Sequence, residues 1–330
     1  MIAKINKFKK EILAKANLHY LVLAVMIIAL VIGMGIKSKY FLTLANMDIL
    51  INNFIMEAIM ALGMTMVIVS GGTDLSIAGI LPFTAIIFAK MMVSGMNIPL
   101  AMVIALAAAV TIGFINNELR RWLKLNPMVV TMATMLTLKG LNLVLTEGVV
   151  VKDFPASFQA IGRHKPLGLS LSCLLYILLS ILLLYLSKNQ KRFIQIFFAG
   201  GNTEAAKLSG INVKRIFRFV YMFSAFLAGV CGILSTTVYN SASFSFGQGV
   251  ELRVITAVAI GGTSLTKGGN GSIAGTMLGS LFMAIIYNAF VMSGISTYYQ
   301  DVVTGALLII SVLLSETIRK IKIKKTQKAF

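Results

Sequence analysis

The chain has 330 residues, of which 58% are hydrophobic and 12% are charged, and its mean hydropathy is +0.88. A water-soluble domain of this length could not keep so apolar a surface hydrated, so the composition predicts a membrane protein. The net charge of +19 does not indicate a nucleic-acid partner, because the Lys and Arg residues flank the apolar segments, as expected for cytoplasmic loops.

The apolar segments predict an all-α polytopic transmembrane helical bundle with about ten spans. Each approaches the ~20 residues that a helix needs to cross about 30 Å of hydrocarbon. Because the turn near 70–76 is short and the segment near 250–265 is barely long enough, eight spans is the alternative count. The expected helices lie near 20–36, 52–70, 76–94, 97–117, 127–145, 169–187, 216–238, 250–265, 272–293 and 297–316.

The basic residues also predict the orientation and the division of the chain. Most of the 30 Lys and Arg residues fall in segments that share one side of the membrane if the N-terminus is inside. We therefore expect both termini in the cytoplasm, as a basic N-terminus (1–19) and a basic tail (317–330). Between them we expect one transmembrane domain (20–316), with its largest cytoplasmic segment at 188–218.

A glycine-rich break separates the second and third predicted spans. Gly71 and Gly72 permit a reversal of the chain, and Asp74 or Ser76 can cap the helix that follows. The alternative interpretation is a functional break that lines a cavity in the membrane.

Two charged residues, Glu57 and Lys139, fall inside apolar segments. They either line a polar path, or form interhelical ion pairs or reach a nearby interface. The chain lacks the Gly-x-x-x-x-Gly-Lys-Ser/Thr loop that holds nucleotide phosphates, and it lacks a cluster with metal-ligand spacing. We therefore expect a conduit with no catalytic residue, cofactor or metal of its own, driven by another chain.

A short helix is predicted inside the basic segment 188–218. Asn202 or Thr203 suits an N-cap, and Gly210 suits a C-terminal stop. The resulting helix of about two turns is too short to be stable alone. A lever that docks into a partner fits its small side chains better than a solvated linker does. The residues concerned are Asn202, Thr203, Glu204, Ala205, Ala206, Lys207, Leu208, Ser209 and Gly210.

A resemblance to a known family is carried by four motifs in order. The stretch Gly201-Asn202-x-Glu204-Ala205-Ala206-x-Leu208-Ser209-Gly210-Ile211-Asn212-Val213 resembles the cytoplasmic coupling segment of permeases in ATP-binding-cassette importers. The similarity is to the ribose, xylose and galactose (monosaccharide) branch, and closest to ribose permeases. It extends from about residue 52 to 315. The other motifs are Gly-Gly-x-Asp-Leu-Ser at 71–76, Gly261-Gly262-Thr263-Ser264-Leu265 with Gly268-Gly269, and Ser296-Thr297-Tyr298-Tyr299-Gln300.

The resemblance implies a permease subunit that translocates a monosaccharide, with a ribose-like pentose favoured, across the bacterial inner membrane by alternating access. The implied partners are a second permease copy or a similar subunit, two cytoplasmic ATPase subunits that bind MgATP, and a periplasmic or extracellular solute-binding protein. Alternatives are a permease of the same superfamily for nucleosides, autoinducer-like furanosyl compounds or branched amino acids, or an ion-coupled secondary sugar transporter. The chain itself is then a transport subunit and not an enzyme.

Two polar aromatic segments lie on the predicted outer side. The stretch 239–248 carries Phe244, Phe246 and Gln248 and contains no Lys, Arg, Asp or Glu. Sugars are polyols with apolar faces, so these segments suit an outer gate or a contact with the binding protein. The alternative is an interfacial aromatic belt. The second segment consists of Tyr298, Tyr299 and Gln300.

Overall fold

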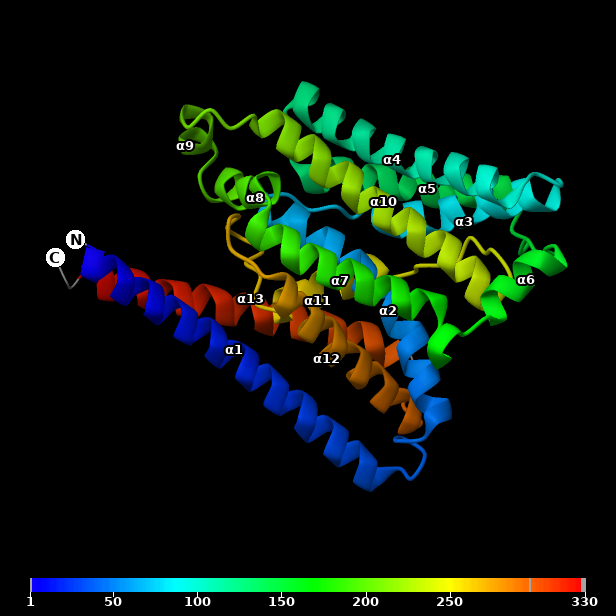
Figure 1. Ribbon diagram of the computed structural model, residues 1–330, viewed down its shortest axis with the longest axis horizontal. Helices are drawn as coiled ribbons and strands as arrows, with labels where there is room; N and C mark the ends of the chain where they lie inside the picture. Colours follow the sequence, from blue (N-terminus) through cyan, green and yellow to red (C-terminus); the bar gives the residue numbers. More distant parts are fainter. Residues whose placement is uncertain (1, 297, 328–330) are drawn as a thin grey trace.

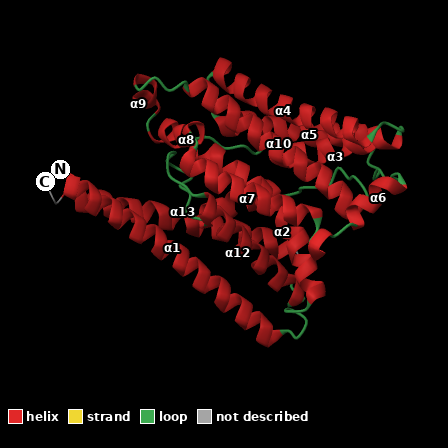
Figure 2. Ribbon diagram, in the orientation of Figure 1, coloured by secondary structure: helices red, strands yellow, loops and turns green. Residues whose placement is uncertain are grey.

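The computed structural model describes residues 2–296 and 298–327 and confirms the all-α bundle (Figures 1 and 2). In this part of the chain the only extended pairing is an isolated β-bridge between Val151 and Ala242. The helices are α1 (Ile2–Lys37), α2 (Leu44–Val69), α3 (Ile77–Val93), α4 (Ile98–Leu123), α5 (Pro127–Thr146), α6 (Ala156–Arg163), the 3-10 turn η1 (Pro166–Gly168), α7 (Leu171–Asn189), α8 (Lys191–Gly201), α9 (Thr203–Leu208), α10 (Val213–Tyr239), α11 (Val250–Ile260), α12 (Ile273–Met292) and α13 (Tyr298–Gln327).

Each predicted span corresponds to a helix, but the helices differ in length. Seven described helices are long and apolar enough to cross a membrane, and α3 and the Tyr298–Leu314 part of α13 are shorter apolar helices. The segment predicted as a span at 250–265 forms only α11, which ends at Ile260 because Gly261 and the left-handed Gly262 (φ 88°) follow it. Its 11 residues cover about 16 Å, roughly half of the hydrocarbon thickness.

Both described ends of the chain lie at the same end of the long axis as α9, and α6 lies at the opposite end (Figure 1). We call these the α9 end and the α6 end. A common position for the two chain ends fits an even number of crossings. Which compartment the α9 end faces stays a prediction.

Helix α2 forms the enclosed centre of the bundle. Every residue from Ile55 to Val69 is buried except Glu57. Helices α7, α10, α11 and α12 pack on α2, and α10 also packs on α3 and α4. Glycines allow the closest crossings: a Cβ atom at Gly232 would clash with the Leu81 carbonyl oxygen, and one at Gly279 with that of Ala257. Small residues thus bring helices of this chain into direct backbone contact.

Candidate functional site

The basic segment 188–218 folds as a pair of short helices, α8 and α9, at the α9 end. Helix α9 lies within the predicted 202–212, whereas α8 was not predicted. Asn202 is extended (φ −154°, ψ 100°), so it ends α8, and its Oδ1 accepts a hydrogen bond from the Ala205 N–H at 3.0 Å. The left-handed Gly210 (φ 76°) follows α9, and its N–H donates to the Lys207 carbonyl at 2.9 Å. The predicted cap and stop therefore both form.

The exposed face of α9 is mixed in character. Leu208 is 90% exposed, so the chain itself leaves this large apolar side chain uncovered. Glu204 and Lys207 form an ion pair at 2.7 Å on the same short helix, and both side chains are exposed. Ala206 instead is 4% exposed and packs into the core of its own bundle. Of the small residues expected to admit a partner, Ala206 therefore faces inward.

Glycines join α8 to two other motifs through direct backbone contact. The Gly269 N–H donates to the Val69 carbonyl, the last residue of α2, at 2.7 Å. A Cβ atom at Gly200 would clash with the same carbonyl oxygen, and one at Gly268 would lie 2.6 Å from the Gly200 oxygen. We call Val69, Gly200, Gly201, Gly268 and Gly269 the glycine junction. It brings together three sequence motifs that are up to 200 residues apart. The contact is so close that no residue larger than glycine fits at position 200.

The break between α2 and α3 lies beside this junction. Gly71 adopts the left-handed conformation (φ 91°), which reverses the chain. A Cβ atom at Gly72 would clash with the Tyr221 hydroxyl of α10, and that hydroxyl donates to the Thr73 carbonyl at 3.3 Å. The predicted reversal therefore also forms a contact between the break and α10.

Asp74 is fully buried inside the break. One carboxylate oxygen accepts from the Ser76 N–H at 3.1 Å and from the Ser76 hydroxyl, and the Ser76 hydroxyl accepts from the Asn116 side chain at 2.9 Å. The second oxygen forms no hydrogen bond of ordinary geometry with a described residue. Burial raises the pKa of the Asp74 carboxyl, and the hydroxyls of Ser76 and Ser224 lower it by less.

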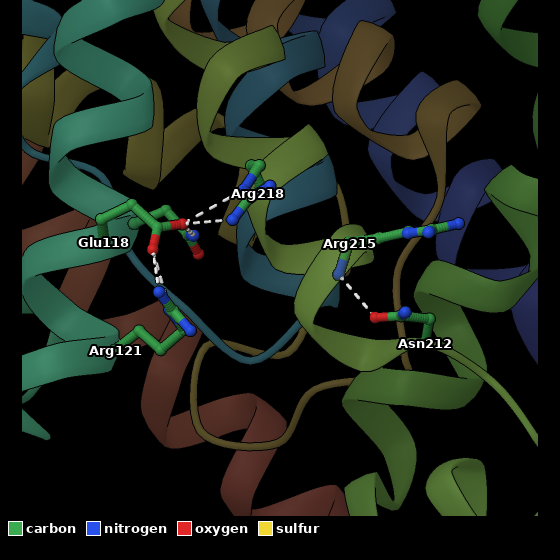
Figure 3. Close-up of polar contacts among 6 residues, drawn as sticks. Glu118, Arg121, Asn212, Arg215 and Arg218 are labelled. Carbon is green, nitrogen blue, oxygen red and sulfur yellow. Dashed lines mark hydrogen bonds and ion pairs between the residues drawn. The ribbon is translucent and has the colours of Figure 1, made fainter.

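A carboxylate joins the last turns of α4 to the start of α10 (Figure 3). Glu118 is 7% exposed, and its two oxygens accept from different guanidinium groups. Arg218 donates to Oε1 from Nε at 3.1 Å and from Nη2 at 2.9 Å, and Arg121 donates to Oε2 from Nε at 2.8 Å. Sequence reasoning missed this contact. The i, i+3 spacing of Glu118 and Arg121 was a signal for half of it, but Arg218 lies 100 residues away.

Asn212 completes the connection from α9 to α10. Its Oδ1 accepts from the Arg215 N–H at 3.1 Å and so caps α10 one turn before Arg218 (Figure 3). Asn212 thus links the segment after α9 to the base of α10, and Glu118 links α10 to α4.

The charged residues predicted inside spans both pair with the first turn of α11. Glu57 Oε1 accepts from Arg253 Nε at 2.6 Å, and Lys139 Nζ lies 3.5 Å from Glu251 Oε1. Of the alternatives for Glu57 and Lys139, their contacts therefore match the interhelical ion pairs. A role of Glu57 in a path stays a prediction.

The structure separates the predicted outer-gate residues into two groups. Phe244 and Phe246 are half-buried against the apolar core, whereas Gln248 is exposed. On α13, Tyr298 and Tyr299 are exposed, at 86% and 60%, and Gln300 is half-buried. The two segments meet near Gly249, where a Cβ atom would lie 3.5 Å from the Asp301 carboxylate.

Comparisons with known proteins identify the family of the chain. Residues 46–312 match the family described as branched-chain amino acid transport system / permease component. The chain is 34% identical over 287 residues to the ribose import permease protein RbsC of Bacillus subtilis (strain 168), an alignment that covers 86% of this chain and 89% of the relative. It is 32% identical to RbsC of Escherichia coli (strain K12) over 87% of this chain and 92% of the relative.

The D-allose transport system permease protein AlsC of Escherichia coli (strain K12) is 30% identical over 89% of this chain and 91% of its own length. No solved structure matches the chain. These relatives and the apolar helices make the chain a multi-pass membrane protein and a transport subunit. It belongs to the permeases of ATP-binding-cassette importers, the family that its ordered motifs predicted.

Proposed function

We propose that this chain is the permease subunit of an importer that moves a monosaccharide, with a ribose-like pentose favoured, across the bacterial inner membrane. Its relatives named as ribose and D-allose permeases cover most of its length, and this supports a sugar substrate. The observation that carries the coupling role is the exposed Leu208 on α9, a short helix between the glycine junction that contacts α2 and the Asn212 cap of α10. MgATP bound in partner subunits would supply the energy for transport.

The α9 end transmits motion because its contacts are short and mostly between backbones. Two cytoplasmic ATPase subunits would dock on α9 and shift it as they open and close. The glycine junction passes this shift to the end of α2, and Asn212 passes it to α10. The spans then exchange between outward-open and inward-open arrangements, which are the two states that the partner biases.

Further partners follow from the same proposal. A second copy of the permease, or a similar subunit, would complete a central path. A periplasmic or extracellular solute-binding protein would deliver the sugar at the α6 end, where Tyr298 and Tyr299 are exposed.

Reconstitution tests this function. The permease, its ATPase and its binding protein are placed in proteoliposomes with internal MgATP, and uptake of labelled D-ribose and D-allose is compared with that of a nucleoside and of leucine. We expect sugar uptake that needs ATP hydrolysis and survives collapse of the proton gradient by an uncoupler. Uptake of leucine or the nucleoside alone would assign a different substrate class, and loss of uptake with the gradient would indicate an ion-coupled carrier.

A further inference from the structure

An ion pair lies at an unusual depth in the bundle. Glu57 is near the middle of α2, about 20 Å from either end, and it is the one residue of Ile55–Val69 that is not buried. It pairs with Arg253 at 2.6 Å, and the two side chains remain 24% and 20% exposed. Charged side chains at this depth do not face lipid, because hydrocarbon offers them no partner. Their open side therefore faces water or another protein.

Groups that bind polyols surround the pair. Tyr239 at the end of α10 and Tyr287 on α12 are both close enough to Glu57 to interact with it electrostatically. The Tyr239 ring is half exposed, and its other neighbour is the Phe246 ring, at 5.3 Å between centroids. The Arg253 Nη1 donates to the Gln248 carbonyl at 3.0 Å. A carboxylate, a guanidinium and two phenols, one of them with a half-exposed ring, thus converge from four elements.

The backbone beside the pair is irregular at membrane depth. Because α11 covers only about 16 Å, the segment 240–249 must complete this crossing toward the α6 end. Non-helical backbone at such depth is tolerated only where protein buries it or where it borders water. Gln248 is exposed although its carbonyl contacts Arg253, so the segment borders an open space at the level of the ion pair.

We infer that Glu57, Arg253, Tyr239 and Tyr287 form a contact site for a neutral polyol on the transport path. The carboxylate accepts from sugar hydroxyls, and the guanidinium and the Tyr239 phenol donate to them. The Tyr287 hydroxyl, which donates to Thr304, can accept from them, and the half-exposed Tyr239 ring offers a face for the apolar side of the sugar. Because the paired charges cancel, the site offers no net charge that would favour an ionic solute over a neutral one. The identity of the ligand rests on the proposed function, whereas the wet location of the site does not.

Removal of both charges together tests the contact without leaving a lone buried charge. In the reconstituted complex, Glu57→Met/Arg253→Met should remain in the membrane and keep ATPase stimulation by the loaded binding protein. Its D-ribose uptake should fall by about tenfold or more, since a hydrogen bond to a charged group contributes about 1.5–3 kcal/mol. The control is the exposed ion pair Asp48–Lys165 at the α6 end, replaced by Asn and Gln, which should transport normally. Normal D-ribose uptake by the double Met variant would overturn the inference.

Thiol labelling tests the location even if that variant fails to insert. In a chain with Cys173 and Cys231 replaced by Ser, Tyr239→Cys should react with a membrane-impermeant methanethiosulfonate, and D-ribose should slow the reaction. The control is Ile181→Cys on α7, a 62% exposed apolar position that should stay unlabelled. An unreactive Tyr239→Cys would show that lipid or a second copy covers this face and would overturn the site. Labelling that no transported sugar slows would overturn sugar contact. The proposed function itself fails only if the unmodified complex takes up no sugar.

Discussion

At the scale of single residues, Asp74 has an unusual position because its carboxyl is buried with only one oxygen well bonded. Asn is the matched replacement: it keeps the oxygen that accepts from Ser76, and its amide can donate to the nearby Ser224 hydroxyl. The raised pKa gives a pH dependence. Below the ordinary value of 3.8 the carboxyl is neutral whether the chain is folded or unfolded, and as the pH rises the unfolded chain ionises first. The wild-type fold therefore loses stability as the pH rises from the ordinary value to the raised pKa, and the loss is complete above the raised pKa.

We predict that Asp74→Asn has a higher apparent melting temperature than the wild type in detergent. The difference should grow as the pH rises above the ordinary carboxyl pKa of about 4, because only the wild type has a carboxyl to ionise. Asp74→Ala is the control. It removes the acceptor for Ser76, so its apparent melting temperature should be lower than that of Asp74→Asn at every pH. A difference between wild type and Asn that does not change with pH would show that the carboxyl costs no stability.

Glu118 on α4 forms ion pairs with Arg121 on the same helix and with Arg218 on α10. We predict that Glu118→Gln lowers the apparent melting temperature by a few degrees, because Arg121 and Arg218 both lose their carboxylate partner. The control is Glu204→Gln on α9, where the ion pair is exposed and contributes little. Equal shifts in the two variants would mean that the Glu118 contacts are as weak as a surface pair.

At the scale of elements, α8 and α9 depend on backbone contact more than on side chains. The glycine junction offers a pair of neighbouring positions with different surroundings. A Cβ atom at Gly200 would clash with the Val69 carbonyl, whereas one at Gly201 would lie 3.8 Å from its nearest neighbour, Gly269 Cα. We predict that Gly200→Ala lowers both thermal stability and coupled uptake, while Gly201→Ala changes neither. Tolerance of both alanines would show that the α9 end can open without cost at this point.

Helix α9 carries one large apolar side chain, Leu208, that no other part of the described chain covers. Leu208 is 90% exposed, and an apolar side chain in that position gains by burial against a partner. We predict that Leu208→Ser leaves the amount of permease in the membrane unchanged and reduces co-purification of the ATPase. Leu42→Ser, at a 61% exposed leucine between α1 and α2, is the control and should not affect ATPase binding. Retention of the ATPase by the Leu208 variant would place the docking surface elsewhere.

At the scale of the whole molecule, features encoded by neighbouring residues were predictable and those made by distant ones were not. Apolar length is a local property, so the spans could be located, and the Asn202 cap and the Gly210 stop of α9 are local as well. The early end of α11 required the conformation of Gly262, and the inward side of Ala206 required the packing of α9. Arg253, the partner of Glu57, and Arg218, the distant partner of Glu118, lie 196 and 100 residues away, so no spacing rule could reveal them.

The common position of the chain ends leads to a prediction about topology. Both ends lie at the α9 end, and the basic residues of the chain gather in the segments at that end. Positive charge is retained in the cytoplasm, so reporters fused to the N-terminus and to the C-terminus should both register as cytoplasmic. A reporter inserted after Glu147, in the loop that leads to α6, should register as outside. Opposite compartments for the two ends would require an odd number of crossings. If all three reporters register in the opposite compartments, the fold stands but its orientation in the membrane is inverted. Helix α9 would then lie outside, out of reach of any cytoplasmic ATPase.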